Sequence, residues 1–368
     1  MKERHDRRDR LPRARPALAG YTPYRTQQQP AAVRLQANEW AEPTPLARYL
    51  TTDDLADTSL NRYPDRDASR LRERLAAELG VGADQLVLGN GSNEVLLYTF
   101  LIFGGPDRTL LVFTPTYTMY GRLGALVGMR VRSEVVGLPY ELDATRVRRA
   151  VAEHGPDLVI LCSPNNPTGT LLAQETIEAA LDAAPDACVV VDEAYGDFAG
   201  QTVIPLIARY PNLVVARTFS KARASAGLRL GMLVADARVA AIYDAARLPY
   251  NLGAVTQRVA LRVLEDGEAV AGRIAHARRE RERIIEALRA MPSLEVYHSA
   301  ANFVLFRHRV RSAASLHASL LSDGILVRDV SGWPDAGESL RVTIGTTEEN
   351  DRFLAAIARA LANDGGGG

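Results

Sequence analysis

The chain of 368 residues carries 44 basic and 44 acidic side chains, so its formal net charge is zero, and 47% of its residues are hydrophobic. A neutral chain offers no electrostatic attraction to nucleic acid or to an anionic membrane surface. No apolar run reaches the roughly 18 residues of a membrane-spanning helix, and the start lacks the pattern of a secretory signal. We therefore expect a cytoplasmic protein of two domains or one large α/β body, with no nucleic-acid or membrane partner.

The cysteines and histidines give no sign of a disulfide or a metal. Cys162 and Cys188 both lie in apolar runs typical of strands, which predicts reduced thiols in the core. The six histidines are scattered without the spacing of metal ligands. We expect neither a disulfide nor a metal site.

The first 80 residues contain one clear helix. Residues 1–20 are charged and rich in arginine and proline, so we expect a disordered tail. Residues 21–48 carry turn signals and little periodicity, which is typical of an arm or an irregular segment. Residues 68–79 have leucines every four residues and precede Gly80, so they form the first predicted helix.

Seven short apolar runs then alternate with helical stretches. Several are almost continuously hydrophobic, as expected of strands covered on both faces by helices. This pattern predicts an α/β fold in which a mostly parallel seven-stranded sheet is covered by helices. The runs are residues 85–88, 109–113, 130–136, 157–162, 187–191, 213–218 and 231–235.

The last third of the chain predicts a long helical region and then a smaller α+β domain. The helical region covers residues 258–290. The small unit has predicted strands near 302–306, 325–328 and 340–344 and predicted helices near 312–322 and 348–362. We expect a large domain over 49–255, a small domain over 256–363 and a flexible tail over 364–368.

Lysine occurs only at Lys2 and Lys221, so 42 of the 44 basic residues are arginine. Lys2 lies in the expected tail, and Lys221 is the only lysine in the expected folded body. A guanidinium group stays protonated, whereas an amine can lose its proton and attack a carbonyl carbon. Compositional bias with one surviving lysine is the alternative explanation, and the flanking residues favour amine chemistry.

Polar residues follow the predicted strands, at the edge where open parallel sheets bind ligands. A glycine-rich turn with Ser92 and Asn93 opens a helix, and its free N–H groups can bind a phosphate. Taken alone, the same turn is explained by Ser92 as a helix cap. Asn166 lies between Pro164 and Pro167, in the loop that follows the predicted strand at residues 157–162. Asp192 ends an apolar strand, where it needs a cation or a donor unless it caps the following helix.

The residues around Lys221 complete a recognisable set. Thr218 and Ser220 precede it, and Arg229 follows eight residues later, so potential phosphate ligands lie beside the amine. A phosphate cradle, an acid for a ring nitrogen and a lysine, in this order along the chain, are what pyridoxal 5′-phosphate requires.

At this point the chain resembles the fold type I aminotransferases and, among them, the histidinol-phosphate aminotransferases of actinobacterial type. The resemblance extends from about residue 21 to about residue 361. The matching segments are residues 62–65, 91–94, 115–117, 165–169, 192–195, 217–221 and 341–343. It implies a fold type I architecture, a large and a small domain, and a homodimer with shared active sites.

The resemblance assigns roles around the cofactor ring. Lys221 binds the cofactor covalently and then moves a proton as base and acid. Asp192 keeps the ring nitrogen protonated, Tyr195 and Asn166 donate to the phenolic oxygen, and Tyr117 stacks on the ring.

It also assigns a phosphate site and a contact between subunits. In this family a tyrosine at the position of Tyr63 reaches the phosphate bound by the neighbouring subunit, which implies a dimer. The phosphate ligands within the chain are Ser92, Asn93, Thr218, Ser220 and Arg229.

For the substrate, the resemblance places Arg341 where a carboxylate or a phosphate ester is held by a guanidinium fork. Arg328 matches a second arginine for a phosphate dianion, with an ordinary surface arginine as the alternative. Tyr24 and Asn38, in the arm, match residues that close over the substrate.

The implied reaction is transamination of L-histidinol phosphate with 2-oxoglutarate, which gives imidazole-acetol phosphate and L-glutamate in histidine biosynthesis. Trp40, Arg223 and Met232 depart from the family pattern, so an aromatic or specialised-metabolite amino donor stays open. A phosphothreonine-type decarboxylase with the same cofactor is a lesser alternative. A DNA-binding regulator is disfavoured, because a tail of about 20 residues is too short for a helix-turn-helix.

Overall fold

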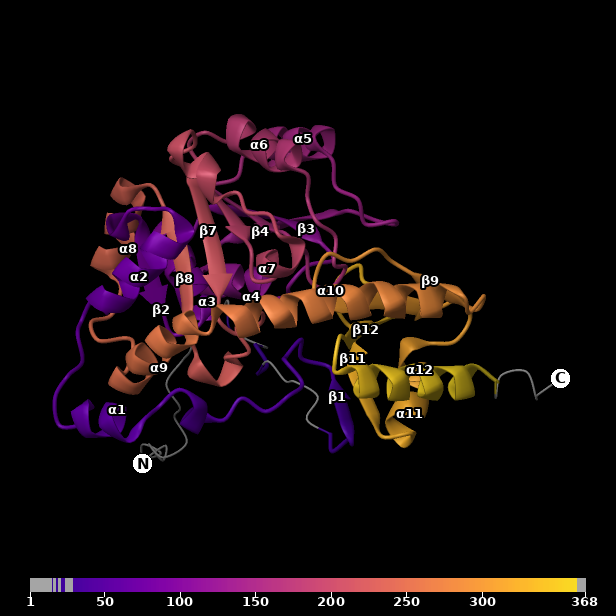
Figure 1. The fold of residues 1–368 in the computed structure, drawn as a ribbon. Coiled ribbons are helices and arrows are strands. Elements are labelled where there is room, and N and C mark those ends of the chain that lie inside the picture. Colours follow the sequence, from indigo (N-terminus) through magenta and orange to yellow (C-terminus); the bar gives the residue numbers. More distant parts are fainter. Residues whose placement is uncertain (1–14, 16–17, 19–20, 24–28, 363–368) are drawn as a thin grey trace, which may run out of the picture.

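The computed structural model describes residues 29–362 together with Arg15, Leu18 and residues 21–23. These residues form a large and a small α/β unit, and the long helix α10 (Gly267–Arg289) runs from one to the other (Figure 1). The predicted terminal tails lie almost entirely outside the described residues. Tyr24 also lies outside them.

The large unit is built on a seven-stranded sheet with the order β2-β8-β7-β6-β5-β3-β4. Only β8 runs antiparallel to its neighbours, so the predicted mostly parallel sheet is confirmed. The strands are β2 (Leu86–Gly89), β3 (Thr109–Thr114), β4 (Arg130–Val135), β5 (Leu158–Cys162), β6 (Cys188–Asp192), β7 (Leu213–Thr218) and β8 (Gly231–Ala235).

Helices cover both faces of this sheet, which explains why its strands are apolar almost throughout (Figure 1). Neighbouring residues of one strand pack on opposite faces, as Leu110 and Leu111 of β3 do. One face is covered by α2 (Ser69–Leu79), α5 (Ala144–His154), α6 (Gln174–Ala183) and α9 (Ala254–Glu265). The other is covered by α3 (Ser92–Phe103), α4 (Met119–Val127) and α8 (Ala237–Ala246).

The small unit contains a five-stranded sheet with the order β1-β11-β12-β10-β9. Helices α10, α11 (Ala313–Ser322) and α12 (Thr347–Ala362) pack on one face of it. Its strands are β1 (Val33–Leu35), β9 (Leu294–Val296), β10 (Phe303–His308), β11 (Ile325–Asp329) and β12 (Ser339–Thr343).

Two parts of this unit differ from the sequence expectation. The arm was expected to be irregular, but its residues Val33–Leu35 form β1, which pairs in parallel with β11. Strand β9 was not predicted either. Both strands have only three residues, too few for an alternating pattern to stand out in the sequence.

The helical region predicted over 258–290 is two helices, α9 and α10, separated at Asp266. Asp266 has a non-helical backbone, and its carboxylate accepts a hydrogen bond from Tyr49 and pairs with Arg48. Val259 and Val263 of α9 are buried in the large core, although the predicted boundary at residues 255/256 gave this helix to the small domain. The domain limits themselves stay predictions.

Two further sequence expectations concern the whole chain. Cys162 and Cys188 are both buried and free, as predicted. Among the described residues there is no helix with the length and apolar character needed to cross a bilayer. The cytoplasmic location stays a prediction.

Candidate active site

A cleft of about 340 Å³ lies between the carboxyl ends of the large sheet's strands and the small sheet. All predicted site residues that the structure describes line it, except Asn38 and Tyr63. These lining residues are Ser92, Asn93, Tyr117, Asn166, Asp192, Tyr195, Thr218, Ser220, Lys221, Arg229, Arg328 and Arg341. The cleft therefore brings together residues from eight separate segments of the chain.

Lys221 lies at the floor of this cleft, three residues after the end of β7. Its Nζ donates a hydrogen bond to the carbonyl of Ala37, at 2.9 Å. Burial lowers the pKa of Lys221 to about 8, and the positive charge of Arg341 acts in the same direction, whereas Glu39 opposes it. The amine therefore gives up its proton far more readily than an exposed lysine.

Asp192 ends β6 and points into the cleft. Its Oδ2 accepts a hydrogen bond from the hydroxyl of Tyr120 at 2.7 Å, and its Oδ1 accepts one from the N–H of Ala194 at 3.0 Å. Burial raises the pKa of Asp192, and these two hydrogen bonds act against that rise. Asp192 does not cap the next helix, α7 (Gly196–Ala199), which begins without a side-chain cap.

Hydrogen bonds fix the residues beside this carboxylate. Asn38 lies behind Tyr195 and donates to its hydroxyl at 2.9 Å. Arg341 of β12 donates through Nη1 to Asn166 Oδ1 and through Nη2 to the carbonyl of Gln36, the latter at 2.8 Å. Burial raises the pKa of Tyr195, so its hydroxyl keeps its proton and remains a donor. One network thus joins the arm, both sheets and the 163–169 loop.

The opposite end of the cleft is suited to an anion. Ser92 and Asn93 form the first turn of α3, whose cap is Gly91 and not Ser92. The hydroxyl of Thr218 donates to Ser220 at 2.9 Å. A Cβ at Gly91 would come within 2.4 Å of Arg229 Nη2 and would displace the guanidinium group, and the positive φ of Gly91 also favours glycine. Helix N–H groups, hydroxyls and a guanidinium together form a cradle for a phosphate group.

A row of arginines lies on the cleft face of the small sheet. Arg34, Arg328 and Arg341 come from the adjacent strands β1, β11 and β12, and Arg328 is directly opposite Arg341 in the register. Arg328 is only 9% exposed. Within the described part of the chain, neither Arg34 nor Arg328 has a hydrogen bond or an ion pair. Like charges directly opposite one another destabilise a sheet, and Arg328 is buried without a counter-charge among the described residues, so the pair of Arg328 and Arg341 favours a bound anion.

Sequence reasoning missed several residues of the cleft. Tyr120 gave no signal, because its partner Asp192 is 72 residues away. Arg34 lies between the two buried residues of β1 and Gln36 directly follows the strand, a pattern too short to recognise. The side-chain oxygen of Gln36 is buried without a hydrogen-bond partner. Glu39 and Trp333 also line the cleft and were not predicted.

Two predicted residues do not line the cleft although the structure describes them. Asn38 is buried one layer behind it. Tyr63 is 80% exposed and stacks on Tyr250, with 4.5 Å between the ring centroids. Its predicted role concerns a second subunit, so this single chain leaves that role a prediction.

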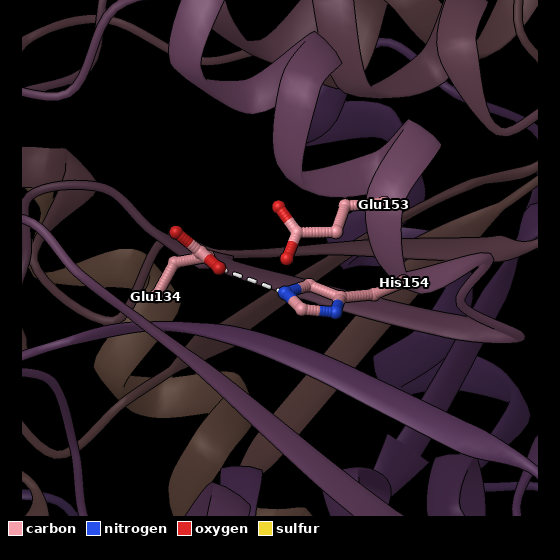
Figure 2. Close-up of side chains that lie close together, drawn as sticks. All are labelled: Glu134, Glu153 and His154. Atoms are coloured by element: carbon pink, nitrogen blue, oxygen red, sulfur yellow. Dashed lines mark hydrogen bonds and ion pairs between the residues drawn. The ribbon is translucent and has the colours of Figure 1, made fainter.

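A separate group of potential metal ligands lies at the edge of the large sheet. Glu134 of β4 and Glu153 and His154 of α5 have their ligand atoms within 4.8 Å of one another (Figure 2). His154 Nε2 is 2.7 Å from Glu134 Oε1, so these two side chains already satisfy each other. None of the three lines the cleft, and the expectation of no metal stays a prediction.

Comparison with known proteins places the cleft in context. Residues 22–357 match the family model described as aminotransferase class I and II. The chain is 42% identical to a curated histidinol-phosphate aminotransferase of Streptomyces avermitilis, over 95% of this chain and 96% of the relative. It is also 42% identical to the enzyme of that name from Thermobifida fusca, over 96% of each chain.

A crystal structure shows the same fold. Histidinol-phosphate aminotransferase from Sinorhizobium meliloti, solved in complex with pyridoxal 5′-phosphate, superimposes with a TM-score of 0.85. The match covers 97% of this chain and 99% of that one at 24% identity, so it supports the architecture.

Proposed function

Because this chain belongs to the class I and II aminotransferases, we propose that it transfers the amino group of L-histidinol phosphate to 2-oxoglutarate, which yields imidazole-acetol phosphate and L-glutamate. The curated relatives of that name match it at 42% identity over nearly their full length. The charge pattern of the cleft supports the same substrate class.

The cofactor is pyridoxal 5′-phosphate, and the residues of the cleft fit it. The cleft offers one reactive amine, one buried carboxyl group and a cradle that a Cβ at Gly91 would fill. When bound, this cofactor supplies an aldehyde for the amine and a ring that accepts electrons from the substrate carbon.

Lys221 is the residue that we assign to covalent attachment and proton transfer. An amine with a pKa of about 8 is partly neutral near pH 7, so it can attack the aldehyde and later accept a proton from the substrate carbon. Asp192 is assigned to the ring nitrogen. A protonated nitrogen beside it would offset the cost of burying the carboxylate.

The cradle residues are assigned to the cofactor phosphate. The N–H groups of Ser92 and Asn93 lie in the first turn of α3, where the helix dipole favours a negative charge. Thr218 and Ser220 add hydroxyl donors, and Arg229 adds a positive charge at the same end.

The observation that carries the substrate assignment is the buried pair Arg328 and Arg341. The two arginines are register partners on β11 and β12, and Arg34 of β1 lines the same cleft. A phosphate monoester carries up to two negative charges and three oxygen acceptors, which suits such a set. Glutamate presents carboxylates to the same residues. A neutral aromatic side chain would leave Arg328 buried without a counter-charge.

We further propose that the protein acts as a homodimer. Exposed apolar side chains flank the stacked pair of Tyr63 and Tyr250, namely Leu60 at 86% exposure and Leu248 at 66%. A patch of this kind favours burial against another protein surface, and a second copy is the partner that the resemblance implies.

The test is a half-reaction of the cofactor-loaded protein with single amino donors. We expect L-histidinol phosphate to convert the cofactor to its amine form fastest at low concentration, ahead of L-histidinol, L-phenylalanine and L-glutamate. Faster conversion by L-phenylalanine would instead identify an aminotransferase for aromatic amino acids. Release of carbon dioxide from a phosphorylated amino acid would identify a decarboxylase.

A variant pair tests the role of Arg328. Arg328→Leu should raise the KM for L-histidinol phosphate by about 100-fold, because a charge-assisted contact contributes roughly 1.5–3 kcal/mol, and should affect L-glutamate less. Arg352→Leu, on the exposed face of α12, is the control and should change neither value. Equal losses for both donors would remove the phosphate-specific role.

A further inference from the structure

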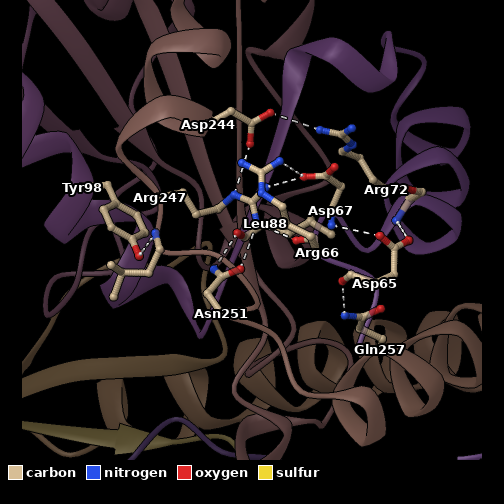
Figure 3. Close-up of polar contacts among 12 residues, drawn as sticks. Asp65, Arg66, Asp67, Arg72, Leu88, Tyr98, Asp244, Arg247, Asn251 and Gln257 are labelled. Carbon is tan, nitrogen blue, oxygen red and sulfur yellow. Dashed lines mark hydrogen bonds and ion pairs between the residues drawn. The ribbon is translucent and has the colours of Figure 1, made fainter. Parts of the chain in front are cut away.

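Residues 247–253, between α8 and α9, contact the cofactor cradle on the side that does not face the cleft. Figure 3 shows two polar residues of this segment, Arg247 and Asn251, surrounded by side chains from the 65–72 region and from α8. Neither residue lines the cleft, and neither was singled out in the sequence. The segment therefore acts on the site only through other residues.

Asn251 joins the two ends of the cradle loop. Its Nδ2 donates to the carbonyl of Leu88 at 3.1 Å and to Glu94 Oε2 at 2.8 Å. The same Glu94 oxygen accepts the N–H of Asn90 at 2.6 Å. Leu88 precedes the loop and Glu94 follows it, so these bonds hold together the strand end and the helix start that enclose Ser92.

Arg247 fixes the amide of Asn251. Its Nη1 donates to Asn251 Oδ1 at 3.1 Å, which orients Nδ2 toward Glu94. The same Nη1 also donates to the carbonyl of Arg66 at 3.0 Å, while Nη2 donates to Asp67 Oδ1 at 2.8 Å and Nε to Asp244 Oδ1 at 3.1 Å. The Arg247 side chain is only 5% exposed. A buried guanidinium with this many partners is a rigid anchor.

The negative charge of Glu94 could compete with a bound phosphate for the N-terminal end of α3. A carboxylate in the first turn of α3 is attracted to the same positive helix end as a bound phosphate. Donors from Asn251 and Asn90 hold that carboxylate on the side of the loop away from the cleft, which Glu94 does not line. The first-turn N–H groups then remain available to the phosphate.

We propose that Asn251, oriented by Arg247 and acting through Glu94, is a positioning residue for the cofactor phosphate. Asn251 keeps the loop between Leu88 and Glu94 closed and holds the Glu94 carboxylate away from the cleft. In this way it sets the affinity for the phosphorylated cofactor. The proposal rests on the cofactor assignment above and is independent of the amino donor. A protein that failed to convert L-histidinol phosphate would leave it intact.

The experiment compares two ligands of the apo protein, pyridoxal 5′-phosphate and phosphate-free pyridoxal. Both can react with Lys221, and only the first occupies the cradle. Asn251→Leu and Glu94→Leu should weaken binding of the phosphorylated ligand about tenfold, roughly 1.4 kcal/mol, and leave pyridoxal unchanged. Dissociation constants are measured by fluorescence titration.

Two control variants sharpen the comparison. Glu94→Gln keeps an oxygen acceptor for Asn90 and Asn251, so it should retain most of the affinity. Gln257→Leu removes the bonds to the carbonyls of Asp65 and Leu252 in the same region without touching the loop, and should change neither ligand. A parallel loss for both ligands in Asn251→Leu and Glu94→Leu, or wild-type affinity in both, would overturn the proposal.

Discussion

At the scale of single residues, Lys221 has surroundings that change its chemistry. It is enclosed by the cleft, near two arginines and one glutamate, and burial is the largest cause of its lowered pKa. With a pKa of about 8, about one amine in ten is neutral at pH 7, compared with roughly one in several thousand for an ordinary lysine. This proportion decides how fast the residue can capture an aldehyde.

We therefore expect the rate of cofactor attachment to rise about tenfold per pH unit below pH 8 and to level off above it. The sign follows because raising the pH removes the proton from Lys221, and only the neutral amine attacks. Stopped-flow absorbance of the apo protein mixed with cofactor measures this rate. N-acetyl-lysine amide is the reference, and a protein rate that still climbs between pH 9 and pH 10.5 would contradict the lowered pKa.

Tyr120 matters to the neighbouring carboxyl group. It is fully buried, and its hydroxyl donates to Asp192 at 2.7 Å. Tyr120→Phe removes this bond, so the pKa of Asp192 rises further and the residue holds a protonated ring nitrogen less well. We expect kcat with L-glutamate to fall about 10- to 100-fold, the value of a hydrogen bond to a charged group.

Tyr243→Phe is the matched control for this prediction. Tyr243 is equally buried, and its hydroxyl bonds to Thr99 at 2.8 Å, away from the cleft. The control should lose about 1 kcal/mol of unfolding free energy and keep its kcat. Equal kcat values for both variants would show that Tyr120 serves only the core.

The sequence predicted some of these residues and not others, for a physical reason. Lys221 stood out because lysine is rare in this chain, and Asp192 stood out because a carboxyl group is unusual at the end of an apolar strand. Tyr120 and Gln36 are ordinary within their own segments, and their roles arise from contacts with distant residues. Local patterns hold no information about such contacts.

At the scale of elements, the strands of the large sheet were predictable because both of their faces are covered. Strand β5 is buried at every position, so its sequence is apolar without interruption. The break at Asp266 was missed although Gly267, a poor helix former, follows it directly. The contact between the Asp266 carboxylate and the distant Tyr49, in contrast, left no local signal.

Strand β8 supports the cradle through a glycine. Gly231 pairs with Gly89 of β2, and a Cβ on Gly231 would lie 2.2 Å from the backbone nitrogen of Ser92. Gly231→Ala must therefore push the start of α3 away. We expect a loss of about 1–3 kcal/mol in unfolding free energy and at least a tenfold weaker cofactor affinity.

Urea unfolding and fluorescence titration measure the two effects of Gly231→Ala. Gly272→Ala provides the comparison, because this helical glycine has open space around it and alanine favours the helix by about 1 kcal/mol. If Gly231→Ala had the stability and the cofactor affinity of the wild type, the cradle would tolerate a displaced start of α3.

At the scale of the whole molecule, the cleft exists only because two sheets meet. Lys221 and Asp192 belong to the large sheet, whereas Arg328 and Arg341 belong to the small one. The arm joins them, since β1 pairs with β11 while the carbonyl of Ala37 accepts from Lys221. A substrate bound between both sets of charges therefore also links the two units.

The stacked tyrosines give a prediction about assembly. We expect the protein to sediment as a dimer and Tyr63→Phe to preserve that dimer, because the ring can still stack on Tyr250. The lost hydroxyl should weaken cofactor retention by about tenfold, as one charge-assisted bond to the partner's phosphate would. An active monomer, or unchanged cofactor retention in Tyr63→Phe, would disprove the shared site.

The scarcity of lysine gives the molecule its own chemical reporter. Lys221 is the only lysine among the described residues, and it stands in the cleft that the cofactor fills. An amine-selective label applied near pH 8 should mark Lys221 in the apo protein and miss it once the cofactor is attached. Comparing the label on Lys221 between apo and cofactor-loaded samples by mass spectrometry therefore reports site occupancy without any turnover assay.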